Sequence, residues 1–432
     1  MIISTNWLAD YVAHGLSADD LYERLTMCGL EVESVDQIGN DLEGVVVGEV
    51  LTAEKHPDAD RLSVCTVNVG ASEPLNIVCG APNVAAGQKV AIATIGTVLH
   101  LPSRDNPDER VPVQMKKAKI RGQESHGMIC AEDELGLGDD HDGIMVLDAD
   151  TEIGLSFSDY LTRQGIATTD NAIDIAITPN RPDAISHLGI ARDIAALTGA
   201  PVTPPQVLIP ESGGAVAQRM SVAIEADDAC HRFVGIMVEG VTIGESPSWM
   251  KSRLQAIGLR PRNNVVDITN YVMYECGQPL HGYDADTLAG GRIIVRKTKG
   301  ESTFVTLDSK ERTLPDATLM ICDGDREVGI AGIMGGENTE VSEKTTNVFI
   351  EAAWFDPSTI RRTAKALSLQ TDASYRFERG VDAEGQAWAA KRAADLMVEL
   401  AGGTIVDGMI DIHPVPYVAP VISLRAKRVT DI

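Results

Sequence analysis

The segment between residues 278 and 380 contains the residue types that hydrolysis of an ester would need. His281 could orient a water molecule or assist proton transfer, because an imidazole changes its charge near neutral pH. Gly335 and Gly336 carry no Cβ, so their backbone amides could come close to a developing oxyanion. Each signal is weak alone, since a Gly-Gly pair usually marks a tight turn and a histidine beside Pro and Gly is often an ordinary loop residue.

Four motifs in this segment are more specific together than any one of them is alone. They are QPLHGYD from Gln278, GIAGIMGGE from Gly329, IEAAW from Ile350 and TDASYRFERG from Thr371. In this order and spacing they resemble the editing region of the bacterial phenylalanyl-tRNA synthetase β subunit, and the resemblance covers nearly the whole chain. It implies a phenylalanine–tRNA ligase component, truncated to the N-terminal portion of the family's β subunit, that binds tRNA and hydrolyses mischarged tyrosyl-tRNA(Phe).

The resemblance also implies a role for Glu351, the glutamate of the IEAAW motif. An apolar pocket for phenylalanine rejects a substrate with one added hydroxyl by only about a hundredfold, so tyrosine is charged by mistake. A second site with a buried acceptor prefers tyrosine, because phenylalanine leaves that acceptor unpaired. Glu351 is expected to be this acceptor, and the structural alternative is a strand-end glutamate paired with an arginine. The other site positions implied by the resemblance are Thr269 and Asn270 at the substrate's polar groups, Thr371 and Ala373 in the pocket wall, and Arg260 near the tRNA 3′ end.

Residues 41–150 are predicted to fold as an OB-fold barrel that binds tRNA. Short apolar runs separated by Gly and Pro indicate strands at 45–51, 62–69, 75–79, 89–95 and 116–120. The motifs KHPDADRL, IVCGAPN and KIRG resemble the tRNA-binding OB-fold domain of the same β subunit. The candidate RNA contacts are mostly cationic side chains: Lys55, His56, Lys116, Lys117, Lys119 and Arg121. The alternative is a solvated edge strand that its lysines protect from pairing.

The remaining segments predict an α+β multidomain fold. Residues 1–40 with 151–199 are predicted to form one small α/β module into which the barrel is inserted, and residues 200–214 a Pro/Gly linker. Residues 215–403 are predicted to form a mixed α/β editing domain of two interleaved modules, and residues 404–432 the start of a truncated further module. Capping signals predict helices after Ser17, after Asn180 or Asp183, after Ser246-Pro247, after Asp356-Pro357 and over 388–400.

Composition narrows the class of protein. At 432 residues with 44% hydrophobic residues, the chain has enough apolar content for about two to four domains. Its 37 Lys and Arg against 63 Asp and Glu give a net charge of −26, so any RNA must be bound by local basic patches. The seven cysteines form no CxxC pair and no zinc spacing, which indicates reduced thiols and no metal site. Short apolar runs and a start without signal-peptide features predict a cytoplasmic protein with no membrane partner.

The sequence contains no phosphate-binding glycine loop of the GxxxxGK(S/T) type, so no cofactor is predicted for this chain itself. The resemblance implies ATP and Mg²⁺ for the full αβ enzyme, whose aminoacylation site is expected on the α subunit. It also implies tRNA(Phe) and that α subunit as partners, in a heterotetramer, and no DNA.

Two alternatives to the editing hypothesis remain open. One is a tRNA-binding and assembly scaffold whose pocket is catalytically silent in this fragment. The other is a general tRNA-binding module with an unrelated partner domain, which rests on the barrel alone. The joint presence of His281, the Gly335-Gly336 pair, Glu351 and Ala373 favours editing, because a scaffold needs none of them.

Overall fold

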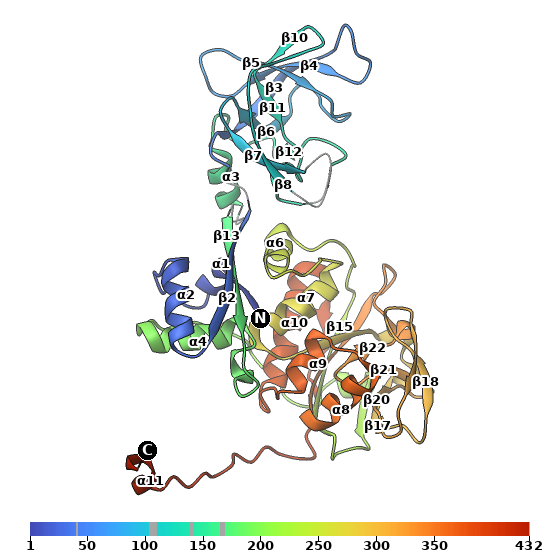
Figure 1. The fold of residues 1–432 in the computed structure, drawn as a ribbon. Helices are drawn as coiled ribbons and strands as arrows, with labels where there is room; N and C mark the ends of the chain where they lie inside the picture. The colour runs from blue at the N-terminus through green and yellow to red at the C-terminus, as the bar shows by residue number, and fades with distance from the viewer. Residues whose placement is uncertain (40–41, 103–109, 139–140, 165–168, 432) are drawn as a thin grey trace.

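The computed structural model describes residues 1–39, 42–102, 110–138, 141–164 and 169–431. The predicted boundary at residues 40 and 41 and the last residue, Ile432, lie outside these ranges. In Figure 1 the chain forms a barrel at one end, a small module beside a larger α/β domain at the other, and an extended C-terminal segment that ends in α11 Ala426–Thr430. Within the described ranges, no helix is long and apolar enough to cross a membrane.

The N-terminal module is a three-stranded antiparallel sheet with the order β1-β13-β2. Its elements are β1 Ile2–Ser4, α1 Thr5–Ala9, α2 Ala18–Met27, β2 Glu31–Gly39, β13 Thr169–Ala176 and α4 His187–Thr198. Ser17 begins α2 with the predicted capping box, because its side chain accepts a hydrogen bond from the Asp20 amide. Helix α4 lies where the sequence predicts one, but Ser186 caps it instead of Asn180 or Asp183, since Pro182–Ala184 first forms a 3₁₀ turn.

The barrel is a six-stranded antiparallel sheet that nearly closes on itself. Its path is β11-β6-β3-β4-β5, and β12 pairs with β6. Strand β5 approaches the segment before β11, where the His126 amide donates to the Asn76 carbonyl at 2.8 Å. The strands are β3 Val45–Lys55, β4 Ser63–Asn68, β5 Leu75–Cys79, β6 Lys89–Thr94, β11 Gly127–Ile129 and β12 Val146–Leu147.

Parts of the barrel differ from the sequence prediction. The chain adds two hairpins, which are β7 Val98–Pro102 with β8 Arg110–Gln114, and β9 Ala118–Ile120 with β10 Gln123–Ser125. Apart from β9 these strands were not predicted, because such short, exposed strands show no clear apolar alternation. Helix α3 Phe157–Arg163 packs the fully buried Phe157 and Leu161 into the core of the barrel. The packed barrel therefore continues past residue 150.

The larger domain consists of two sheets and the helices that cover them (Figure 1). The first sheet has the order β16-β23-β15-β24, with β25 also paired to β15, and the second has the order β14-β17-β20-β21-β22. The first contains β15 Cys230–Glu239, β16 Leu280–Asp284, β23 Asn347–Phe355, β24 Thr404–Ile405 and β25 Ile410–Ile412. The second contains β14 Ser221–Ile224, β17 Arg292–Lys297, β20 Leu319–Cys322, β21 Glu327–Ile330 and β22 Met334–Gly335. Outside both sheets lie α5 Val216–Arg219 and the hairpin of β18 Ser302–Val305 with β19 Glu311–Leu314.

Alternate residues of the first sheet face two different hydrophobic clusters. On one face, Val348 and Ile350 of β23 pack with α7 Asn264–Cys276 and α10 Gln386–Ala401. On the other face, Phe349 and Phe355 pack with the second sheet and with α8 Pro357–Leu367 and α9 Asp372–Phe377. Because a strand points successive side chains to opposite faces, a residue's position along β16 or β23 determines which cluster it joins.

Capping residues set the helix boundaries in this domain. Asp356 begins α8 as predicted, because its carboxylate accepts from the Thr359 amide at 2.7 Å. Helix α6 Ser248–Ala256 follows Pro247, while the predicted cap, Ser246, donates instead to the Asp267 carboxylate. Helix α7 was not predicted, although Asn263 caps its start and the left-handed Gly277 ends it.

A buried polar chain joins the N-terminal module to the larger domain. The Trp7 indole donates to the Tyr11 hydroxyl at 2.7 Å, which in turn donates to the Glu275 carboxylate at 2.7 Å. Arg392 donates two hydrogen bonds to the same carboxylate, whose side chain is fully buried. Since breaking one member would leave a buried charge or donor unpaired, this chain holds the two parts together.

Candidate active site

A cavity of about 80 Å³ lies between the two sheets of the larger domain. Its walls come from β16 and β23, from the hairpin of β21 and β22, and from α9. Figure 1 shows α9 next to this hairpin, and the Thr371 hydroxyl before α9 donates to the Ile333 carbonyl in the hairpin turn at 2.9 Å. The segments that carry the four sequence motifs therefore meet at one cavity.

Glu351 and His281 face each other across neighbouring antiparallel strands. They are paired residues of β23 and β16, so both side chains point to the same face of the sheet. Glu351 accepts a hydrogen bond from the Tyr283 hydroxyl at 2.7 Å. Burial raises the pKa of the Glu351 carboxyl to about 7, although the Tyr283 hydrogen bond lowers it in part. The partner of this carboxyl is a phenol, where the structural alternative expected an arginine.

The His281 ring lies in the wall of the cavity as a neutral base. Burial lowers the pKa of its imidazole to about 4, so the ring is uncharged at neutral pH. Its ring centroid is 4.5 Å from that of Tyr283, in an edge-on contact. Its Nε2 atom is buried and has no hydrogen-bond partner among the described residues. A neutral nitrogen without a partner can accept a proton or a hydrogen bond from a water molecule.

The two glycines of the β22 region make space for neighbouring rings. A Cβ on Gly335 would lie 2.6 Å from the His281 ring, and a Cβ on Gly336 would lie 2.6 Å from the Phe304 ring. The Gly336 amide donates to the Val328 carbonyl at 2.8 Å, so it is used within the hairpin. The sequence analysis expected a free backbone amide at Gly336. This expectation is wrong, because the hairpin already uses the amide as a donor and leaves none for an oxyanion.

Thr371 and Ala373 lie at the start of α9. The resemblance assigns both residues to the pocket wall. The Thr371 hydroxyl accepts from the Ser374 amide at 3.1 Å while it donates to the hairpin turn, so it fixes the helix to the cavity. Ala373 lines the cavity directly. A small side chain here leaves room that a larger one would fill.

Thr269 and Asn270 lie on α7, which covers the other face of the first sheet. A Cβ built on Gly282 would lie 4.0 Å from the Thr269 methyl group, so Gly282 faces α7. Its strand neighbours His281 and Tyr283 therefore point the opposite way, into the cavity. The structure does not bring Thr269 and Asn270 to this cavity, because the sheet lies between them.

Arg260 lies in the loop between α6 and α7 and is exposed to solvent. It is not among the residues that line the cavity. Its contact with the tRNA 3′ end stays a prediction.

Tyr283 lines the cavity and is the candidate site residue that the motif analysis missed. It follows His281 by two positions in the same strand, so the period-two alternation of a strand could have placed both on one face. Its role depends on the hydrogen bond to Glu351, which needs the register between β16 and β23.

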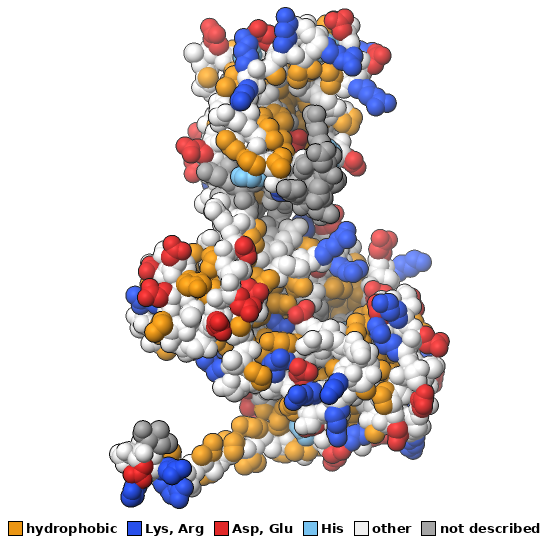
Figure 2. All heavy atoms as spheres, viewed as in Figure 1, with side chains coloured by type: hydrophobic (Ala, Val, Ile, Leu, Met, Phe, Trp, Pro, Cys, Tyr) orange, Lys and Arg blue, Asp and Glu red, His pale blue; other side chains and the backbone are white. Residues whose placement is uncertain are grey.

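The predicted RNA contacts of the barrel gather around one hairpin and one loop. Lys116, Lys117 and Lys119 are exposed on or beside β9, where Lys117 pairs with Glu124 at 2.9 Å. Next to this hairpin, Lys55 and Arg121 line a hollow of about 440 Å³. Figure 2 shows basic and acidic side chains together at this end of the molecule. The basic run therefore offers a local surface and not a uniformly positive face.

His56 differs from the other predicted contacts because it is only 2% exposed. Its Nδ1 accepts from the Asp58 amide at 3.0 Å, and its Nε2 lies 3.2 Å from the Ile120 carbonyl. The imidazole therefore links the loop to the hairpin. The predicted contact of His56 with RNA is wrong, because the buried ring has a structural role instead. It positions Lys55 and Arg121 on either side.

The described residues contain no candidate metal site. Among them, no set of three or more His, Cys, Asp or Glu side chains is placed to hold a metal ion. All seven cysteines are free thiols, and most of them are buried.

Comparisons with known proteins match both regions. Residues 45–156 match the family described as a putative tRNA binding domain, and residues 229–402 match the B3/4 domain. The chain is 55% identical over 432 residues to the phenylalanine–tRNA ligase beta subunit of Salinibacter ruber, covering 100% of the chain and 52% of that protein. It is 48% identical to that of Nitratidesulfovibrio vulgaris, covering 99% and 52%. It is 47% identical to that of Geobacter sulfurreducens, covering 99% and 51%, so the chain spans about half the length of these curated relatives.

Proposed function

The chain belongs to the family of phenylalanine–tRNA ligase beta subunits, and from this premise we propose that it binds tRNA and hydrolyses tyrosine mischarged onto tRNA(Phe). In this proposal the barrel acts as an OB-fold domain and binds the tRNA. The cavity between the two sheets binds the aminoacyl ester. Assembly with an α subunit, aminoacylation by the whole enzyme with ATP and Mg²⁺, and a cytoplasmic location belong to the same proposal. The described residues offer no ligand set for Mg²⁺, and no step below uses one.

The hydrogen bond from Tyr283 to Glu351 carries the proposal. It supports Glu351 as a buried acceptor of a phenol, which is the group that distinguishes tyrosine from phenylalanine. A carboxylate has two acceptor oxygens, so one can hold Tyr283 while the other accepts a second phenol. Phenylalanine would leave this second oxygen desolvated and unpaired, at a cost of about 1–3 kcal/mol.

Hydrolysis needs a base beside the ester, and the geometry of His281 supports that role. The imidazole is neutral, and its Nε2 has no hydrogen-bond partner within the described ranges. It could therefore take a proton from water as the water oxygen bonds to the ester carbon, and pass that proton to the ribose oxygen as the ester C–O bond breaks, which releases the amino acid and a free ribose hydroxyl. The cavity of about 80 Å³ has room for a phenol end and water, and the rest of the aminoacyl ester would extend from its mouth.

The barrel supports the tRNA part of the proposal through its basic hairpin. Lys116 and Lys119 are exposed and form no ion pair among the described residues, in a chain whose net charge is −26. Lysines without a carboxylate partner are free to replace the counterions of phosphates. The contact would then be mainly electrostatic.

Deacylation by the purified chain tests the proposal. Tyrosyl-tRNA(Phe) and phenylalanyl-tRNA(Phe) would be incubated with the chain, and the loss of each ester would be measured under single-turnover conditions. We expect faster hydrolysis of the tyrosyl ester. If the chain binds tRNA but hydrolyses neither ester, the scaffold alternative replaces this one.

A further inference from the structure

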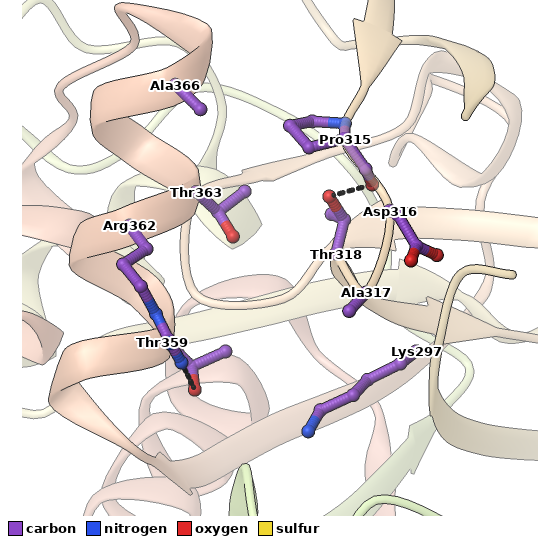
Figure 3. Close-up of a pocket in the computed structure, with 9 residues that line it drawn as sticks. All are labelled: Lys297, Pro315, Asp316, Ala317, Thr318, Thr359, Arg362, Thr363 and Ala366. Atoms are coloured by element: carbon purple, nitrogen blue, oxygen red, sulfur yellow. Dashed lines mark hydrogen bonds between the residues drawn. The ribbon is translucent and has the colours of Figure 1, made fainter. Parts of the chain in front are cut away.

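A second pocket, of about 290 Å³, lies outside the candidate active site, between α8 and the turn that joins β19 to β20. Figure 3 shows it from close by, with side chains of both elements around the opening. Lys297 and Arg362 supply positive charge, and Thr363 supplies a hydroxyl group. The hydroxyls of the other two threonines in the lining donate to the Pro315 carbonyl and to the Asp356 carboxylate. We propose that this pocket binds a phosphate group.

The two cations reach the pocket from different elements. Lys297 comes from the end of β17 and Arg362 from α8, and Figure 3 shows the Lys297 ammonium directed toward the side where Arg362 and Thr359 lie. Lys297 also pairs with Asp228, whose side chain is 68% exposed, so this pair is open to exchange with another anion. Two cations that converge from separate elements suit an anion with several oxygens.

The negative groups around the pocket are already hydrogen-bonded. Asp316 accepts from the Gly300 amide at 2.6 Å, and its carboxylate points away from α8 in Figure 3. Asp356 accepts from the Thr359 amide and hydroxyl at the start of α8. Neither carboxylate forms a salt bridge with Lys297 or Arg362 among the described residues, so Asp228 is the acid that a bound anion would have to displace from Lys297.

Thr363 adds a hydroxyl group to the lining of the pocket. It is only 9% exposed, and it lines the pocket. Figure 3 shows this hydroxyl directed into the space between α8 and the turn. A hydroxyl directed into this space can donate a hydrogen bond to an oxygen of a bound anion.

The surrounding surface also favours an anion. Helix α8 carries Arg361, Arg362 and Lys365, and none of the three forms a salt bridge within the described ranges, although Arg362 donates to the Thr359 hydroxyl at 3.4 Å. Figure 2 shows basic side chains gathered over α8. In a chain with a net charge of −26, such a patch concentrates anions locally.

The pocket lies one helix away from the candidate active site. Ile360, on the buried face of α8, lies 3.0 Å from the position that a Cβ on Gly332 would take, and Gly332 lines the catalytic cavity. An α-helix with its side chains is about 10 Å across. A backbone phosphate of an RNA that enters the cavity could therefore reach the pocket, and so could a free phosphate compound. The shared chemistry is the phosphate.

Two matched substitutions test the site, and neither is part of the proposed catalytic machinery. Thr363→Val keeps the side-chain volume and removes the hydroxyl, and Arg362→Gln removes one charge from the pocket. Arg361→Gln is the control, because Arg361 is an exposed residue of the same helix that does not line the pocket. Binding of inorganic phosphate would be measured by calorimetry, and binding of a short single-stranded RNA by fluorescence anisotropy, with melting temperatures for all variants.

We expect Arg362→Gln and Thr363→Val to weaken phosphate binding on the order of tenfold, as expected for the loss of a charged hydrogen bond. Arg361→Gln should leave it nearly unchanged. The same pattern with RNA identifies a backbone phosphate as the ligand, and unchanged RNA binding identifies a small phosphate compound. Equal weakening by Arg361→Gln and Arg362→Gln, or no effect of Arg362→Gln and Thr363→Val on either probe, would overturn the proposal.

Discussion

The Tyr283 hydroxyl donates a 2.7 Å hydrogen bond to the Glu351 carboxyl inside the cavity. One phenol thus already occupies the group that is proposed to bind the phenol of the substrate. Both residues are buried, and Tyr283 also contacts the His281 ring. This arrangement connects the residue proposed to set specificity with the residue proposed to assist catalysis.

Tyr283→Phe should reduce the preference for tyrosyl-tRNA by on the order of 1 kcal/mol, because Glu351 loses the partner that orients it. Since the Tyr283 hydrogen bond lowers the pKa of Glu351, its loss should also move that pKa upward. The measurement is the ratio of tyrosyl to phenylalanyl deacylation rates as a function of pH. A purely structural role would slow both esters equally and leave the pH midpoint unchanged.

The preference for tyrosine should rise as the pH increases through about 7, where the Glu351 carboxyl ionises. Burial holds this group protonated at a higher pH than an ordinary glutamate, and a protonated carboxyl keeps one oxygen as a donor. Only the ionised form offers one acceptor oxygen to Tyr283 and the other acceptor oxygen to the substrate. The ratio of the two rates would be measured from pH 6 to pH 8. In Glu351→Gln the ratio should stay flat, and a slope that persists there would refute this explanation.

His281→Ala should slow hydrolysis of both esters together, because the placement of water is common to the two substrates. Gly335→Ala should do the same, since its Cβ would lie 2.6 Å from the His281 ring. In the His281→Ala background, Gly335→Ala should cause little further loss, because the ring it displaces is absent. Rates for the four proteins of this cycle give the coupling. Additive losses would show that Gly335 acts independently of His281.

Replacing Lys116, Lys117 and Lys119 with Ala should weaken tRNA binding and flatten its salt dependence. Each lost phosphate contact reduces the log–log slope by about 0.7 to 0.9. Lys344→Ala is a matched control, because Lys344 is an exposed lysine of the larger domain. Unchanged affinity and slope in the triple variant would remove the barrel hairpin from the RNA contact.

Local signals made part of the structure predictable. Ser17, Asp356 and Gly402 mark helix ends because capping depends on neighbouring residues in the chain. The same kind of signal was available for α7 at Asn263 and Gly277, and reading it would have placed Thr269 on a packed helix. Placing Thr269 on that helix would also have raised the question of which face of the sheet it covers.

Long-range register explains what the sequence could not predict. The pairing of His281 with Glu351 depends on how β16 aligns with β23, which are far apart in the chain. The bond from Tyr283 to Glu351 follows from the same register. The buried position of His56 depends on a contact with the β9 segment, and its sequence motif looks the same whether the ring faces solvent or the interior.

The selectivity of deacylation by Glu351→Ala tests the central claim most directly. Single-turnover rates for tyrosyl-tRNA(Phe) and phenylalanyl-tRNA(Phe) would be compared between this variant and the unmodified chain, with melting temperatures as a control for folding. The account predicts that the preference for the tyrosyl ester falls by on the order of 1–3 kcal/mol, the usual cost of one buried hydrogen-bond partner. A Glu351→Ala chain that is folded, active and as selective as the unmodified chain would contradict it.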